Sequence, residues 1–188
     1  HRRNIRKARK AGLEYEVDDD LARIDAFREM YYARMDELDA ADFYFFPEEY
    51  FDEMRRLGNR VFLGLVRSGE RIVAGGVFMI DGPWGHYHLG ASLSDAFDLR
   101  PNHLLHYETT LEMRRRGARL YHLGGGNSDD PNDPLFVFKR RFSPRTLDFS
   151  IGKMIFDPER YEAACEAWRR ERPEKVERYG KFLLCYRY

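Results

Sequence analysis

The stretch that decides the fold runs from His86 to Gly126, HYHLGASLSDAFDLRPNHLLHYETTLEMRRRGARLYHLGGG. It begins and ends with short apolar runs, over 86–91 and 120–123, which are typical of strands. Between them a helix is predicted from about residue 102 to 116, followed by Gly117 as a terminator. A strand, a crossover helix and a strand form a βαβ unit, so the two strands are predicted to be parallel neighbours.

Two further strands precede this unit and are predicted to pair with it in an antiparallel meander. They cover 61–66 and 72–80, with a hairpin turn at Ser68-Gly69-Glu70 between them. A second turn at 81–85 leads into the strand at 86–91. The sequence therefore predicts an α/β fold with a mixed, mostly antiparallel sheet, a βαβ crossover and flanking helices.

The remaining elements are expected on both sides of this region. Strands are predicted over 13–17, 146–155 and 182–186, and helices over 20–38, 47–57 and 158–172. Hydrophobic residues make up 43% of the chain, enough for a globular protein with a packed core. We expect one domain over residues 1–188, beginning with a basic helix over residues 1–12.

Composition excludes several classes of protein. Lys and Arg number 32 and Asp and Glu number 32, so the chain lacks the overall basic charge of a dedicated nucleic-acid binder, and no DNA partner is expected. No run approaches the roughly 18 apolar residues of a membrane span. Cys165 and Cys185 have no metal-ligand spacing and are expected to be two reduced, packed thiols in a cytoplasmic protein.

The first residues are strongly basic. The charged residues of 2–10 are all Arg or Lys, and Ile5 alone breaks the polarity. This helix is therefore expected to be exposed or to lie on something outside the chain, either as a patch for phosphates or as a solvated linker. Because the chain begins at His1 in the middle of a helical pattern, we expect it to be part of a longer protein.

A glycine-rich stretch followed by cations gives the first candidate site. Gly124, Gly125 and Gly126 come directly after the strand at 120–123, where glycine permits a tight turn and a close approach of a ligand. A polar loop and the apolar segment 135–138 then lead into Lys139-Arg140-Arg141. Cations next to aromatic residues at such a place suit an anionic ligand, although a solvated basic face would have the same pattern.

The histidines offer a second kind of chemistry. His86 and His88 share a strand face, His103 and His106 share a helix face, and His122 lies on the next strand. Without an HExxH motif or a nearby cysteine, a metal site is not predicted. His106 or His122 could act as a general base. There is no GxSxG motif, so nothing supports a hydrolase.

The order of elements outlines the GNAT acyltransferase fold. In that fold a bulged strand offers backbone N–H groups to an acyl carbonyl, here at Gly90 and Ala91, and a helix N-terminus beside it takes a pyrophosphate, here at Arg100 and Asn102. A CoA-using member would carry a Gly-rich phosphate loop before that helix. This chain has DLRPNHL at 98–104, without glycine, which disfavours acetyl-CoA.

Over most of its length the sequence resembles the Fem-type family of GNAT-fold aminoacyltransferases, which build peptidoglycan interpeptide bridges. The resemblance is carried by five stretches in order: RRNIRKARKAGL at 2–13, YHLGAS at 87–92, LRPNHLLHYE at 99–108, YHLGGG at 121–126 and DPLFVFKRRFSP at 133–144. Family members have two tandem GNAT-like domains. The resemblance therefore implies that an N-terminal GNAT-like domain precedes this chain, which would be the C-terminal half of the protein.

The resemblance also implies an activity: transfer of an amino acid from aminoacyl-tRNA to an amine of UDP-MurNAc-pentapeptide or a lipid-linked precursor, with no metal and no cofactor. The family's functional Phe-Lys pair lands on Phe138 and Lys139, with Lys139 stabilising the oxyanion or a phosphate. Candidate substrate-binding residues are Gly90, Ala91, Arg100, Asn102, His106, His122, Gly124, Gly125, Gly126, Arg140 and Arg141. An acyl-CoA-dependent N-acetyltransferase and a non-catalytic GNAT-like module remain as alternatives.

Overall fold

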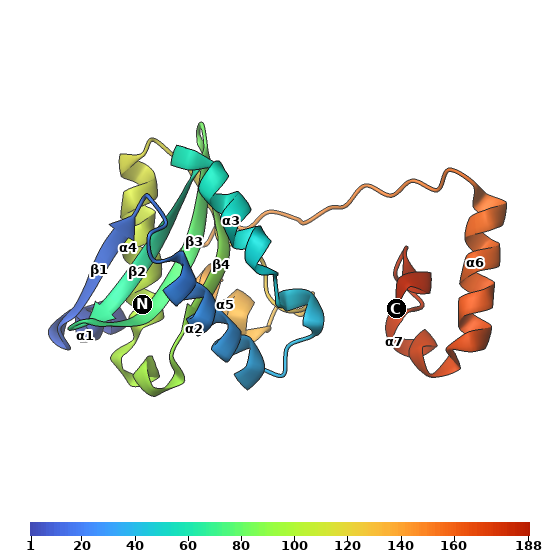
Figure 1. Cartoon of the computed structure of the whole chain (residues 1–188), viewed down its shortest axis with the longest axis horizontal. Helices are drawn as coiled ribbons and strands as arrows, with labels where there is room; N and C mark the ends of the chain where they lie inside the picture. The colour runs from blue at the N-terminus through green and yellow to red at the C-terminus, as the bar shows by residue number, and fades with distance from the viewer. The chain divides into compact units, whose positions relative to one another are not determined.

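The computed structural model describes residues 1–188, which form two compact units, His1–Thr146 and Leu147–Tyr188. Figure 1 shows the extended segment of chain that joins them. The single domain expected over the whole chain thus corresponds to two units in the structure. The first unit carries the sheet and all of the candidate site residues, and each unit is described separately below.

The first unit contains a five-stranded sheet in the order β1-β2-β3-β4-β5 (Figure 1). Its strands are β1 (Leu13–Asp18), β2 (Val61–Ser68), β3 (Arg71–Asp81), β4 (Trp84–Ser92) and β5 (Leu120–His122). The first four strands pair in antiparallel fashion, whereas β4 and β5 are parallel and are joined by helix α4 (Pro101–Arg115). The predicted meander and βαβ unit are confirmed.

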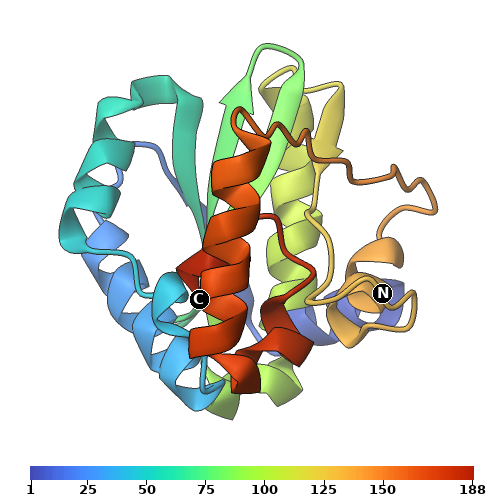
Figure 2. The same cartoon turned by 90° about the vertical axis from the view of Figure 1, so that its right-hand side faces the viewer.

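Helices cover both faces of this sheet, as Figures 1 and 2 show. The helices of the first unit besides α4 are α1 (Arg2–Lys10), α2 (Ile24–Glu37), α3 (Glu48–Arg56), α5 (Pro134–Arg140) and the short 3₁₀ turns Asp42–Tyr44, Gly58–Arg60 and Ser94–Leu99. One core packs α1 and α4 on the sheet and includes Leu104 and Phe78; the other packs α2 and α3 on the opposite face and includes Phe27 and Phe51.

Helix α1 lies on the domain itself, so the expectation that it is exposed or rests on something outside the chain is wrong. Ile5 and Ala8 are buried in the same core as α4. Arg9 forms an ion pair with Glu108 of α4 at 2.6 Å. The sequence pattern did not reveal this contact because only two positions of a strongly cationic helix, Ile5 and Ala8, are buried.

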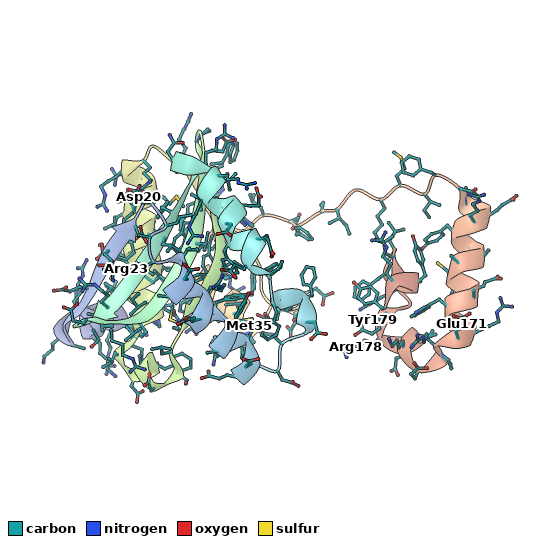
Figure 3. The ribbon with its side chains drawn as sticks, viewed as in Figure 1. Asp20, Arg23, Met35, Glu171, Arg178 and Tyr179 are labelled. Atoms are coloured by element: carbon teal, nitrogen blue, oxygen red, sulfur yellow. The ribbon has the colours of Figure 1, made fainter.

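The second unit contains helix α6 (Pro158–Glu171), the 3₁₀ turns Pro173–Lys175 and Cys185–Arg187, and the one-turn helix α7 (Val176–Tyr179). Cys165, Trp168 and Cys185 form its small core, and the two cysteines are free thiols, as expected. Figure 3 labels Arg178 and Tyr179 on α7, where the guanidinium of Arg178 lies 5.1 Å from the ring centre of Tyr179.

The predicted strands at 146–155 and 182–186 are wrong. Leu147, Phe149 and Ile151 alternate as in a strand, but no neighbouring strand pairs with them, and Phe149 is 90% exposed. At the second position the backbone N–H of Cys185 bonds to the carbonyl of Phe182, which closes a turn. Across both units, no helix combines the length and the apolar character needed to cross a bilayer.

Candidate functional site

The candidate site lies where β4 and β5 separate, which we call the fork. The two strands pair at only three positions, the last of which sets His86 opposite His122. Strand β4 continues to Ser92, whereas β5 ends at His122 and leads through Leu123 into the three glycines. Beyond the fork, the edge of β4 therefore has no strand partner and can offer backbone groups to a ligand.

A β-bulge in β4 sets the direction of the side chains at the fork. Opposite β3, Tyr87 pairs with Phe78 and Leu89 pairs with Val77, which leaves His88 as the extra residue. The sequence predicted the bulge at Gly90 and Ala91, and the structure places it two residues earlier. Gly90 pairs regularly with Gly76, and the side chain of Ala91 is buried in the core.

Tyr87 lies across Gly90, and the sequence analysis missed its role. A Cβ atom added to Gly90 would lie 2.7 Å from Cζ of Tyr87 and closer still to its hydroxyl. Glycine is needed here because the bulge turns Tyr87 and Gly90 to the same face. The Tyr87 ring packs against His106 at 4.7 Å between centroids, and burial raises the pKa of Tyr87 to about 12, so its hydroxyl stays protonated.

Asp133 joins the glycine loop to helix α5. As the N-cap of α5, its carboxylate accepts the N–H of Phe136 at 2.9 Å, and it also accepts the N–H of Asn127 at 3.1 Å. These hydrogen bonds, that of Phe136 first, lower the pKa of Asp133. A Cβ atom on Gly126 would lie 2.6 Å from Cγ of Asp133, so only glycine allows the loop to pack this closely.

Lys139 is held on the rim of the fork by this same loop. Its Nζ donates to the carbonyl of Gly125 at 2.9 Å and lies 5.3 Å from the ring centre of Tyr87. Gly124 has a φ of 75°, which directs the loop toward Nζ. Burial lowers the pKa of Lys139. The ammonium is thus fixed between a carbonyl and an aromatic face rather than by a carboxylate.

Phe138 packs into an aromatic cluster between α5 and α4. Its ring lies 5.1 Å from the ring of His103, 5.6 Å from that of His106 and 5.4 Å from that of Phe142. It therefore fastens α5 to α4. Phe138 contacts His106, Lys139 lies over Tyr87, and these two rings pack on each other at 4.7 Å between centroids.

The N-terminus of α4 contributes Arg100 and Asn102. Arg100, with a φ of 65°, is the N-cap residue, and its Nε is buried without a hydrogen-bond partner. Asn102 donates from Nδ2 to Oγ of Ser92 at 2.9 Å, which ties α4 to the end of β4. Pro101 has no N–H, and the N–H of His103 bonds to the carbonyl of Arg100. Few free amides are left for a pyrophosphate.

Of the two candidate general bases, the structure favours His122 over His106. His106 is 3% exposed, and burial, followed by the charges of Lys139 and His103, lowers its pKa to about 3. It therefore stays neutral at physiological pH. His122 is exposed, and its Nδ1 lies 3.1 Å from Nδ1 of His86. No group of three His, Cys, Asp or Glu side chains has the geometry to hold a metal ion.

Arg140 and Arg141 are exposed at the end of α5. The guanidinium of Arg140 lies 5.5 Å from the ring centre of Phe136, on the same helix. Arg141 ends α5. The structure therefore brings Lys139, the three glycines, Gly90 and His122 to the fork, with His106 buried behind Tyr87. The pairing of the strands identifies Tyr87 and His86 as further residues of the site. Sequence spacing alone does not show that they lie there.

The chain is similar to known proteins over part of its length. The chain is 35% identical over 72 residues to the lipid II:glycine glycyltransferase of Staphylococcus haemolyticus, a match that covers 36% of this chain and 17% of the relative. The Staphylococcus epidermidis enzyme of the same name matches equally. The chain thus spans only about a sixth of the length of these relatives. The resemblance to the Fem-type family is confirmed over the matched residues.

Solved structures share the fold. FemX superimposes with a TM-score of 0.60 at 19% identity, covering 73% of this chain and 52% of that one. An aminoglycoside acetyltransferase from a soil metagenome has a TM-score of 0.58 at 10% identity and covers 76% of this chain and 98% of that one. The family model of the acetyltransferase (GNAT) domain matches residues 1–140, the sheet with the fork and α5. The chain therefore belongs to the acetyltransferase (GNAT) domain family.

Proposed function

We propose that this chain is the GNAT domain of an acyltransferase that moves an aminoacyl group from aminoacyl-tRNA to an amine of a peptidoglycan precursor. The observation that carries the proposal is the cation at the fork: Lys139, held by Gly125 and Tyr87 beside an unpaired strand edge. The similarity to lipid II:glycine glycyltransferases supports the acceptor class, a lipid-linked precursor or UDP-MurNAc-pentapeptide. A cytoplasmic location and an accompanying second GNAT-like domain belong to the same proposal.

The chemistry is direct attack of the acceptor amine on the ester carbonyl of the donor. The N–C bond forms first, and the carbonyl oxygen becomes negatively charged before the ester C–O bond breaks. Backbone N–H groups on the free edge of β4 and the ammonium of Lys139 are positioned to stabilise this oxyanion. Because the ester is already activated, neither a covalent enzyme intermediate nor a cofactor is required.

The geometry at α4 favours an aminoacyl ester over an acyl-CoA donor. The first turn of α4 has Pro101 at its start and an N–H of His103 that is already bonded, so it lacks the row of free amides that a pyrophosphate needs. An acyl-CoA-dependent N-acetyltransferase remains the second candidate. It is supported by the fold that this chain shares with an aminoglycoside acetyltransferase, since the match covers 98% of that enzyme.

Transfer and binding measurements test the proposal together. Transfer from labelled aminoacyl-tRNA to lipid II should fall by about 100-fold in kcat for Lys139→Ala, with little change in KM, because a charge that stabilises the transition state is lost. Arg114→Ala, which removes an exposed cation from the last turn of α4, is the matched control and should transfer normally.

Calorimetry with acetyl-CoA and UDP-MurNAc-pentapeptide separates the two candidates. Binding of the UDP precursor, with an affinity that changes little in Lys139→Ala, supports the proposal. Saturable binding of acetyl-CoA, together with transfer of its acetyl group, would replace it with the CoA-dependent function. A Lys139→Ala variant that transfers within a factor of two of the wild-type rate would show that Lys139 has no role in the chemical step.

A further inference from the structure

Two histidines face each other at the last paired position of β4 and β5, where the fork begins. His86 of β4 and His122 of β5 are paired residues, their Nδ1 atoms are 3.1 Å apart, and their rings are nearly parallel, at 10°. Such a contact requires one Nδ1 to carry a proton and the other to accept it. In the neutral pair, the histidine that donates has an unprotonated Nε2. The neutral pair therefore presents one basic nitrogen, which becomes occupied when the pair accepts a proton.

The groups around the pair disfavour its protonation, so a proton that it accepts is not held tightly. His88 lies on the same strand and is hydrogen-bonded to the hydroxyl of Tyr50 from α3, and Lys139 approaches from α5. Burial first, then the charges of His122, His88 and Lys139, lower the pKa of His86. None of these neighbours is a carboxylate. A proton taken up by the pair is therefore easily released again.

We propose that the His86–His122 pair accepts the proton that the acceptor amine must lose during transfer. The inference rests on the proposed function and adds the proton acceptor to it. The pair lies at the closed end of the fork, next to the free edge of β4 and within the field of Lys139. A nucleophile and an oxyanion stabiliser would then meet on opposite sides of one carbonyl group.

The acceptor amine is taken to arrive at the fork as an ammonium ion, which carries one proton more than the attacking amine. The ammonium gives one proton to the free Nε2 of the pair, and the neutral amine attacks the ester carbon. When the N–C bond has formed and the C–O bond breaks, the proton that remains in excess on nitrogen passes to the leaving ribose oxygen. The pair then returns its proton to solvent, which leaves an amide, an alcohol and one released proton.

The test combines rates with titration in three variants. His86→Gln and His122→Gln each break the pair, whereas Tyr50→Phe removes the partner of His88 and leaves the pair intact. Transfer to lipid II is measured between pH 6 and 9. In the same proteins, NMR of labelled imidazoles follows the titration of His86 and His122.

We expect either Gln variant to lose tenfold or more of kcat at pH 7, with KM little changed. The loss should shrink toward pH 9, where solvent deprotonates the amine, and a merely structural role would not give this recovery. The two imidazoles should titrate together in wild type and in Tyr50→Phe, and the remaining one should titrate alone in each Gln variant. Rate profiles of the Gln variants that run parallel to wild type at every pH would overturn the proposal.

Failure of the proton role and failure of the proposed function give different results. If wild type transfers from aminoacyl-tRNA but the Gln variants keep its pH profile, the proton role alone is wrong. If wild type transfers to no amine while the imidazoles still titrate together, the proposed function is wrong and the proton role falls with it. Inactivation of the wild type by a chelator, with no further effect of the chelator on the Gln variants, would assign the histidines to a metal instead.

Discussion

Replacing Gly90 by alanine should disturb the fork more than any other single methyl group. The new Cβ would lie 2.7 Å from Cζ and 2.8 Å from Cε2 of Tyr87, whereas ordinary carbon contacts begin near 3.5 Å. The tyrosine ring must therefore move by about 1 Å or rotate. It is packed between Phe78 and His106, at 5.5 and 4.7 Å between centroids, so it has little room to do so.

The expected cost follows from this overpacking. Forcing an extra methyl group into a packed site costs about 1–3 kcal/mol, and we expect a loss of about 2 kcal/mol in the free energy of unfolding. Movement of Tyr87 also takes the aromatic face away from Lys139, so transfer should fall. Urea unfolding measures the first effect. Gly152→Ala, where an added Cβ meets nothing within 4 Å, is the matched control.

A double-mutant cycle isolates the contact. In a Tyr87→Ala background the ring is absent, so Gly90→Ala should cost less than 0.5 kcal/mol, roughly the error of additivity for independent sites. If Gly90→Ala costs the same with and without the ring, the clash with Tyr87 is not the cause. If the single variant is as stable as wild type, the close packing of Tyr87 on Gly90 is refuted.

Three further predictions concern the parts that support the fork. Because hydrogen bonds hold the pKa of Asp133 below its usual value, its carboxylate stabilises the fold above about pH 4 and loses this effect as the pH falls through the lowered pKa. The stability difference between wild type and Asp133→Asn in urea should therefore shrink in acid, and a difference that stays constant would contradict the cap. Ile5→Ala should lower the free energy of unfolding by about 2–3 kcal/mol, because Ile5 is buried. Arg6 is exposed, so Arg6→Ala should change the free energy of unfolding by less than about 0.5 kcal/mol, and chemical denaturation measures both values. Cys165 and Cys185 should react with a thiol reagent only after unfolding, because both are buried; rapid reaction in the folded protein would show that this small core opens.

The sequence predicted the parts of the fold that depend on local periodicity. The apolar runs of β4 and β5 and the helix between them can be read in a single pass because each element repeats its own pattern. The extended segment from Leu147 to Ile151 shows the limit of this method. Its alternation is that of a strand, but a strand exists only when another strand supplies its hydrogen bonds, and sequence spacing does not report the partner.

In the candidate site, too, the features that depend on local sequence patterns were predictable, and those that depend on contacts between strands were not. Gly124 to Gly126 and Lys139 were found because glycines after a strand and cations after an aromatic run have direct chemical meanings. The role of Tyr87 and the contact of His86 with His122 were not, because both depend on pairing between strands. A bulge that shifts by two residues exchanges the faces of all the side chains between the two positions.

The shortness of β5 has a geometric consequence for what the fork can hold. A strand advances by about 3.3 Å per residue, so each further residue that paired with β4 would shorten the free edge by that length. The three glycines, which disfavour strand structure, stop the pairing at His122. The position of the first glycine along the chain therefore fixes the length of the β4 edge that stays unpaired.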